Sequence, residues 1–153
     1  MFLRHKFVTN SSNTSFVGFG VWLENEELLT LALHLLKDAK PNKLKKLFWI
    51  DDEKFDEWYK GYKEDPREVI DDSSEVESII GKFIPVSVES PDYGGGAYLH
   101  VGMPDVDMDF ETGKVEVSGS EKVLEDGRKL QKALKECGLC SKLGVVSDCW
   151  RDG

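Results

Sequence analysis

Two regular hydrophobic patterns follow each other along the chain and predict its helices and strands. Residues 15–23 are rich in aromatic and β-branched side chains, which predicts a strand. The glycines of this strand fall on one side, so we expect a neighbouring segment to approach closely there. Asn25 can cap a helix. Apolar residues crowd the following segment through Leu36, which predicts a deeply buried helix that ends before Pro41.

A second helix is predicted in a strongly charged segment, with Asp51 or Asp52 as its cap. Its aromatic residues recur at i, i+3, i+4 and i+7, the spacing that places side chains on one helical face. Residues 42–50, between the first two helices, are short and ambiguous. A further short helix over 74–80 should end at Gly81. The aromatic face of the charged helix consists of Phe55, Trp58, Tyr59 and Tyr62.

From residue 83 onward the apolar period falls from 3.6 to 2, which indicates strands. We expect strands at 83–88 and 97–103, and then a hairpin whose first strand, 105–110, alternates strictly between apolar and acidic residues. Its apolar residues Val106, Met108 and Phe110 should face inward. A helix after Ser118 or Ser120 and a last strand at 143–149 complete the chain. The predicted buried stripe of that helix is Val123, Gly127, Leu130, Leu134 and Cys137.

This order of elements predicts an α+β fold. We expect one domain with a mostly antiparallel sheet of about five to six strands and helices packed on one face. The length of 153 residues suits a single domain. Residues 1–14 should form a basic and polar N-terminal arm, and residues 15–153 the α+β domain.

Charge and composition limit the partners of the chain. Its net charge is −9, which argues against direct binding to nucleic acid, because phosphates attract lysine and arginine. No apolar run approaches the roughly 18–20 residues needed to cross a bilayer. The polar residues 9–15 stand where a signal peptide needs its apolar segment. We therefore expect a cytoplasmic protein without a membrane partner.

Two sets of residues could in principle bind a metal ion. Cys137 and Cys140 have the spacing of half a zinc site, and Cys149 could add a third thiolate, although buried free cysteine is the ordinary alternative. Asp105, Asp107 and Asp109 could offer oxygen ligands to a divalent cation, or simply form the solvent-facing side of a strand. Neither set is complete enough to imply a cofactor.

His100 is the histidine of most interest, because it lies in a predicted strand beside a glycine-rich loop. The loop residues Gly94, Gly95 and Gly96 could cradle a phosphate on backbone N–H groups. Known phosphate cradles lead into a helix, however, and here a strand follows. One functional hypothesis is a small metal- or phosphate-dependent enzyme centred on His100 and this loop, although the sequence holds no recognisable catalytic machinery.

The favoured hypothesis is a non-catalytic protein-binding protein that acts through residues 51–77. This segment holds twelve acidic residues against four basic ones, a net charge of −8. Aromatic side chains rimmed by acids suit a partner with a basic groove, whereas the same aromatic face could also just pack on the core. A third hypothesis is an acidic DNA mimic that inhibits a DNA-binding enzyme. The expected contact residues are Asp51, Asp52, Phe55, Glu57, Trp58, Tyr59 and Tyr62.

Residues 7–16 read Phe-Val-Thr-Asn-Ser-Ser-Asn-Thr-Ser-Phe and follow the basic residues Arg4 and Lys6. This segment resembles the opening FVTNSSSSSF of a scattered set of small prokaryotic and phage proteins of unknown function, with Asn13 and Thr14 interrupting the serine run. The resemblance covers ten of 153 residues. It implies a bacterial, archaeal or mobile-element origin, and it brings no activity and no catalytic residues.

Overall fold

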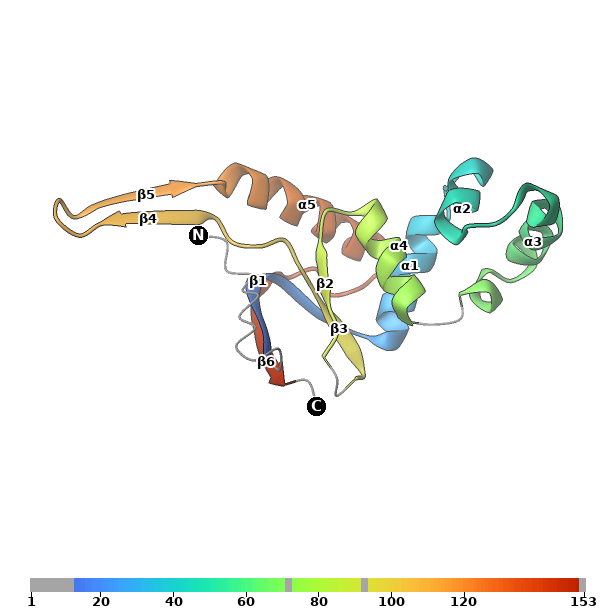
Figure 1. The fold of residues 1–153 in the computed structure, drawn as a ribbon, viewed down its shortest axis with the longest axis horizontal. Coiled ribbons are helices and arrows are strands. Elements are labelled where there is room, and N and C mark those ends of the chain that lie inside the picture. Colours follow the sequence, from blue (N-terminus) through green and yellow to red (C-terminus); the bar gives the residue numbers. More distant parts are fainter. Residues whose placement is uncertain (1–12, 71–72, 92–93, 152–153) are drawn as a thin grey trace.

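The computed structural model describes residues 13–70, 73–91 and 94–151. The strands in these segments are β1 (Asn13–Glu24), β2 (Ser87–Glu89), β3 (Gly96–His100), β4 (Asp105–Asp109), β5 (Lys114–Ser118) and β6 (Gly144–Arg151) (Figure 1). The helices are α1 (Asn25–Leu36), α2 (Pro41–Phe48), α3 (Asp52–Glu64), the 3-10 helix η1 (Pro66–Val69), α4 (Ser73–Phe83) and α5 (Ser120–Glu136). The predicted α+β class is confirmed.

The strands form two antiparallel sheets, where the sequence predicts one. The larger sheet has the order β2-β3-β1-β6, and β4 pairs only with β5. The long central strand β1 pairs with β6 from Asn13 to Gly20 and with β3 from Gly20 to Glu24. The β4–β5 hairpin projects from one end of the molecule, and α2 and α3 lie at the other end (Figure 1).

Three helices cover one face of the larger sheet. Helices α1, α4 and α5 meet the apolar side chains of β1 and β3 and enclose the hydrophobic core with them. Burial of these side chains removes apolar surface from water and drives the packing of the two layers. Among the described residues, no helix has the length and apolar content to cross a membrane. The largest fully buried side chains of the core are Leu23, Leu31, Leu36, Leu44, Ile80, Leu99, Leu130 and Leu134.

The opposite face of the larger sheet carries the glycines predicted to permit a close approach, and the structure confirms that prediction. A Cβ at Gly20 would overlap the backbone carbonyl oxygen of Leu99 on β3, and one at Gly18 would overlap the ring of His100. The absence of side chains at these two positions lets β1 and β3 lie close together, with the His100 imidazole against the β1 backbone.

Helix α5 follows its predicted pattern. Gly127, Leu130 and Leu134 are buried, Val123 and Cys137 are partly buried, and the helix ends before Gly138, whose φ is +73°. A positive φ is the backbone conformation that favours glycine directly after a helix.

Several local expectations are wrong. The N-cap of α1 is Glu24 and not Asn25, and the N-cap of α5 is Gly119 and neither Ser118 nor Ser120. The strand expected at 97–103 ends at His100. Gly81 does not end a helix, because α4 continues to Phe83, and the following strand begins only at Ser87. The apolar side of β4 does not face inward either. Val106, Met108 and Phe110 are 43, 54 and 89 % exposed, because the β4–β5 hairpin projects from the core (Figure 1) and no described helix or strand covers its apolar side.

Candidate functional site

The aromatic face predicted on α3 is turned mainly toward the rest of the molecule. Tyr62 is buried, and its hydroxyl donates a hydrogen bond of 3.4 Å to the carbonyl oxygen of Leu36 at the end of α1. Burial, with a smaller effect of Tyr59, raises the pKa of the Tyr62 hydroxyl. Tyr62 therefore joins α3 to the core and offers a partner very little surface.

The other three aromatic residues of α3 are partly buried and stack on one another. Phe55 lies 5.9 Å from Trp58 and 5.4 Å from Tyr59, measured between ring centroids. Trp58 also contacts Phe48 of α2 at 5.0 Å. Such aromatic contacts stabilise the packing of α2 against α3. The acidic residues predicted beside them, Asp51, Asp52 and Glu57, are exposed, and Asp52 forms an ion pair with Lys45 of α2.

Trp49 is the prominent exposed aromatic residue of this end of the molecule, and the sequence analysis did not single it out. It follows α2 directly, at the C-cap position, and its side chain is 86 % exposed. Its backbone is left-handed, with φ 55° and ψ 45°, a conformation that is unfavourable for a bulky residue. Trp49 thus combines a strained backbone with a large apolar side chain that is exposed to solvent.

Two hollows flank Trp49. One, of 510 Å³, is lined by Lys45, Lys46, Ile50 and Asp51, among others. The second, of 210 Å³, lies between the end of α2 and the helix α4, and Ile79 forms part of its wall. A partner side chain can therefore contact the indole from either side. In the sequence, the only signal for this site is a tryptophan and an isoleucine in a segment next to an acidic helix.

His100 lies on the sheet face opposite the helices and is fully buried. Its ring stacks on Phe16, with centroids 4.9 Å apart and an angle of 15° between the planes. Its Nε2 lies 3.5 Å from a carboxylate oxygen of Glu89 on β2, which is also buried. No described residue forms a hydrogen bond to either ring nitrogen. The sequence analysis missed Glu89, because its proximity to His100 depends on the pairing of β2 with β3.

The structure does not bring His100 together with the glycine loop. Gly96 begins β3 and His100 ends it, so about 13 Å of strand separates them. Gly94 and Gly95 are exposed and have φ values of +70° and +87°. The carbonyl oxygen of Gly95 accepts a hydrogen bond of 3.1 Å from the N–H of Asn25, which holds the loop against the start of α1.

The predicted metal ligands are not gathered around a common point. Asp105, Asp107 and Asp109 lie exposed along β4, and in the described part of the chain no three His, Cys, Asp or Glu side chains are placed to hold an ion. Burial and the neighbouring Glu136 raise the pKa of the Cys137 thiol, which disfavours the thiolate that binds zinc. Cys140 is exposed, and the side chain of Cys149 lies outside the described residues.

No known protein family, curated protein or solved structure matches this chain. The resemblance of residues 7–16 falls mostly on residues outside the described part, since β1 begins at Asn13.

Proposed function

We propose that this chain is a protein-binding protein without catalytic activity of its own, and that Trp49 is the anchor of its binding surface. The observation that carries the proposal is the tryptophan that is 86 % exposed between two hollows. Tryptophan is enriched among the residues that dominate binding energy, because its large apolar side chain fills a partner's pocket at a low cost in conformational entropy.

The charge around Trp49 indicates the chemistry of the partner. Asp51, Asp52, Glu53, Asp56 and Glu57 follow it in sequence and are exposed, with Lys54 as the only basic residue among them. Lys45 and Lys46 line one hollow beside Trp49, but acidic residues outnumber basic ones by five to three over residues 45–57. The rim of the surface is therefore acidic on balance, and its anchor is apolar. A partner that presents a basic groove with an apolar pocket would be complementary in both respects. The proposal keeps the acidic surface favoured by the sequence but makes Trp49 its anchor, because Trp58 and Tyr62 are packed within the fold.

The test begins with a photo-reactive amino acid at position 46, which lines the same hollow as Trp49, used to cross-link the partner in the cell of origin. The affinity of the purified partner is then measured for the wild type and for Trp49→Ala. We expect Trp49→Ala to weaken binding by about 30-fold, the effect of losing about 2 kcal/mol at an interface anchor. We also expect the wild-type affinity to fall as salt is added, because the acidic rim is exposed.

Two control variants separate binding from folding. Val145→Ala truncates an exposed apolar side chain on β6 and should leave the affinity unchanged. Trp58→Ala should lower the thermal stability by opening the aromatic stack, with a smaller effect on affinity than Trp49→Ala. The proposal is wrong if the purified partner binds Trp49→Ala as tightly as the wild type.

A further inference from the structure

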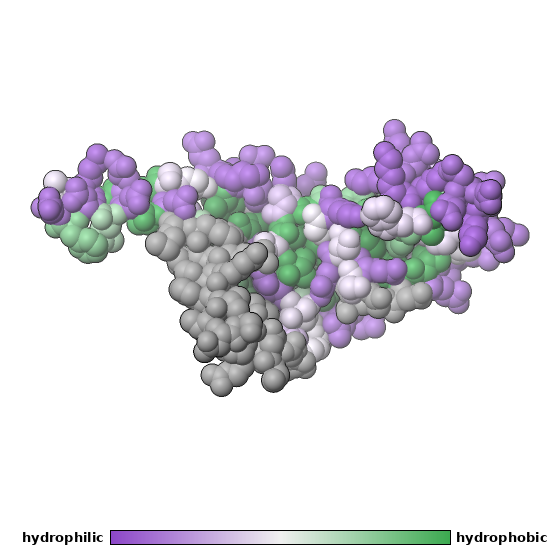
Figure 2. Space-filling view, in the orientation of Figure 1, coloured by the Kyte–Doolittle hydropathy of each residue, from purple (hydrophilic) through white to green (hydrophobic). Residues whose placement is uncertain are grey.

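The β4–β5 hairpin has one apolar and one acidic side, and both are exposed to solvent. The strand register places Val106 opposite Val117 and Met108 opposite Val115, so these four side chains share one side. Each of them is between 43 and 56 % exposed, and Phe110 at the tip is 89 % exposed. Figure 2 shows hydrophobic residues along one edge of the hairpin and hydrophilic residues along the other. An apolar face of this extent on a two-stranded hairpin calls for a covering partner, because isolated hairpins are only marginally stable in water.

The same chain carries an apolar pocket near the base of this hairpin. It has a volume of 270 Å³ and lies between the first half of α5 and the sheet, with Phe19, Val101, Val123 and Leu143 in its walls. An apolar cavity of about 150 Å³ is already sufficient to bind a benzene ring. The pocket is therefore large enough for the phenyl ring of Phe110. Leu124, at its edge, is 56 % exposed and extends the apolar surface outward.

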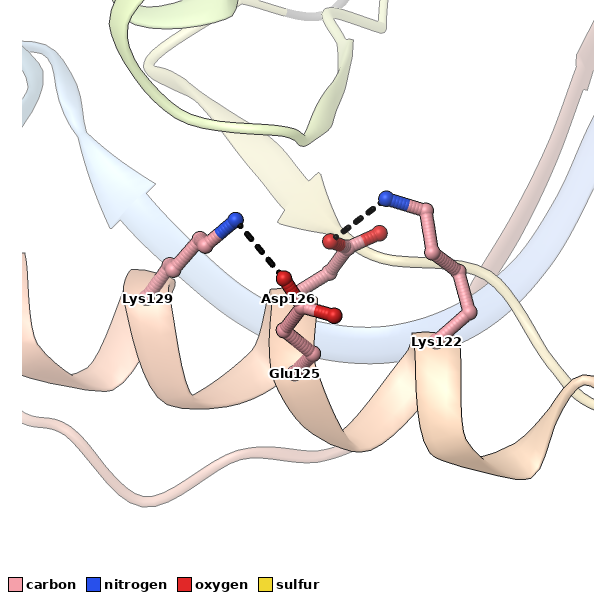
Figure 3. A network of polar contacts seen from close by, with 4 residues as sticks. All are labelled: Lys122, Glu125, Asp126 and Lys129. Atoms are coloured by element: carbon pink, nitrogen blue, oxygen red, sulfur yellow. Dashed lines mark hydrogen bonds and ion pairs between the residues drawn. The ribbon is translucent and has the colours of Figure 1, made fainter.

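Charges at the tip and at the pocket are complementary. The tip residue Glu111 and the pocket residue Arg128 are both exposed, and neither forms an ion pair with a described residue. Two lysines of α5 near the pocket are already engaged: Lys122 pairs with Asp126 at 3.0 Å, and Lys129 pairs with Glu125 at 3.1 Å (Figure 3). Arg128 is thus available to a carboxylate that arrives with the tip of a hairpin.

We infer that two copies of this chain form a dimer in which each hairpin docks on the other copy. The hairpin strands are about 17 Å long, and the α5 residues that line the pocket, Val123 to Gln131, lie about 5–17 Å along the helix from its start at the hairpin base. A two-fold axis that crosses each hairpin near Val106 and Met108 would place the two hairpins antiparallel, with their apolar sides in contact. The same axis carries Phe110 to the partner's pocket and Glu111 to the partner's Arg128. Each contact then occurs twice, and the interface closes as a dimer.

The test is the mass of the full-length protein in solution, measured by sedimentation equilibrium over a range of concentrations. The wild type should have twice the 17.3 kDa mass of the chain. Phe110→Ser should be monomeric at concentrations where the wild type is dimeric. Because Phe110 is exposed, this variant should keep its circular dichroism spectrum. Glu111→Arg and Arg128→Glu should each weaken dimerisation at least tenfold through repulsion between like charges.

The double variant Glu111→Arg with Arg128→Glu distinguishes this interface from any other. It restores opposite charges at both contacts, so its dimerisation constant should return to within about threefold of the wild-type value. Lys60→Glu, an equal charge change on the exposed side of α3, should have no effect. A monomeric wild type overturns the inference, and so does a dimer that survives Phe110→Ser. Single variants that weaken the dimer without rescue in the double variant overturn it as well. None of these outcomes bears on Trp49, because Trp49 ends α2 and α2 lies at the opposite end of the molecule (Figure 1).

Discussion

Gly20 has a place in the fold that no other residue can take. It pairs with His100 on β3 and with Gly144 on β6, and a Cβ at this position would overlap the carbonyl oxygen of Leu99. The obstacle is backbone on a central strand, which cannot move aside as a flexible side chain can. The sequence indicated this role, because glycine weakens a strand unless a neighbour approaches closely.

We therefore predict that Gly20→Ala destabilises the protein by about 3 kcal/mol, since the two central strands must separate to accept the methyl group. Gly81→Ala is the matched control. Gly81 lies inside α4 with open space around its Cα, so alanine there should raise the stability by up to about 1 kcal/mol. Urea unfolding measures both variants on the same scale. Equal stabilities for Gly20→Ala and the wild type would show that β1 and β3 are further apart than the structure places them.

At the scale of elements, the sequence predicts the type and position of a helix or strand better than it predicts which other elements surround it. The apolar stripe of α5 and the aromatic period of α3 are local patterns, and both helices lie where these patterns place them. The alternation in β4 likewise predicts the hairpin. Alternation shows that one side of a strand is apolar, but not which element covers it, so the exposed position of the hairpin could not be derived. The strand expected at 83–88 was wrong at its start because packing carried α4 beyond Gly81.

The candidate site shows the same limit. The spacing of Phe55, Trp58 and Tyr62 correctly predicts one aromatic face, but a face suited to a partner and a face suited to the core have the same sequence pattern. The exposure of Trp49 could not be predicted from the sequence pattern, because Trp49 lies in the left-handed turn that ends α2. The approach of the Glu89 carboxylate to His100 depends on the register of β2 against β3, which is a long-range property.

The tip of the β4–β5 hairpin depends on a charged carboxylate. Oδ1 of Asp109 accepts hydrogen bonds of 2.9 Å from the N–H of Glu111 and of 3.4 Å from the N–H of Thr112. Both bonds lower the pKa of Asp109 below its ordinary value, and the bond from Glu111 has the largest effect. Because the pKa of Asp109 is lower in the folded state, its carboxylate stabilises the turn at every pH above the pKa that it has in the unfolded chain. This contribution to stability is lost as the pH falls through the pKa of the folded state.

We predict that the amide NMR signals of Glu111 and Thr112 shift with a midpoint below about pH 3.9, the ordinary pKa of aspartate. The shift reports the loss of the two hydrogen bonds when Asp109 is protonated. Asp109→Asn keeps the shape of the side chain without the titrating group, so its amide signals should not move over this range. A midpoint at or above the ordinary value would mean that the carboxylate does not hold the turn.

At the scale of the whole molecule, the two proposed contact surfaces lie at opposite ends. The β4–β5 hairpin projects from one end, and α2, which ends at Trp49, is at the other (Figure 1). A dimer joined through the hairpins would therefore display two Trp49 surfaces, far apart and pointing in opposite directions. The arrangement turns a chain with a single binding surface into a bivalent protein without any further contact.

Bivalency makes a prediction that neither surface makes alone. On a densely coated surface of the partner, the wild-type dimer should dissociate at least tenfold more slowly than the Arg128→Glu variant. Both proteins are applied at a concentration where only the wild type is dimeric, and release of a dimer requires both contacts to open together. In solution, with the partner dilute and monovalent, the two proteins should bind with the same affinity per site, since Arg128 is remote from Trp49. The double variant Glu111→Arg with Arg128→Glu should recover slow dissociation along with the dimer. Equal dissociation of monomer and dimer from the coated surface would show that only one Trp49 surface can engage at a time, and that the two ends of the molecule do not act together.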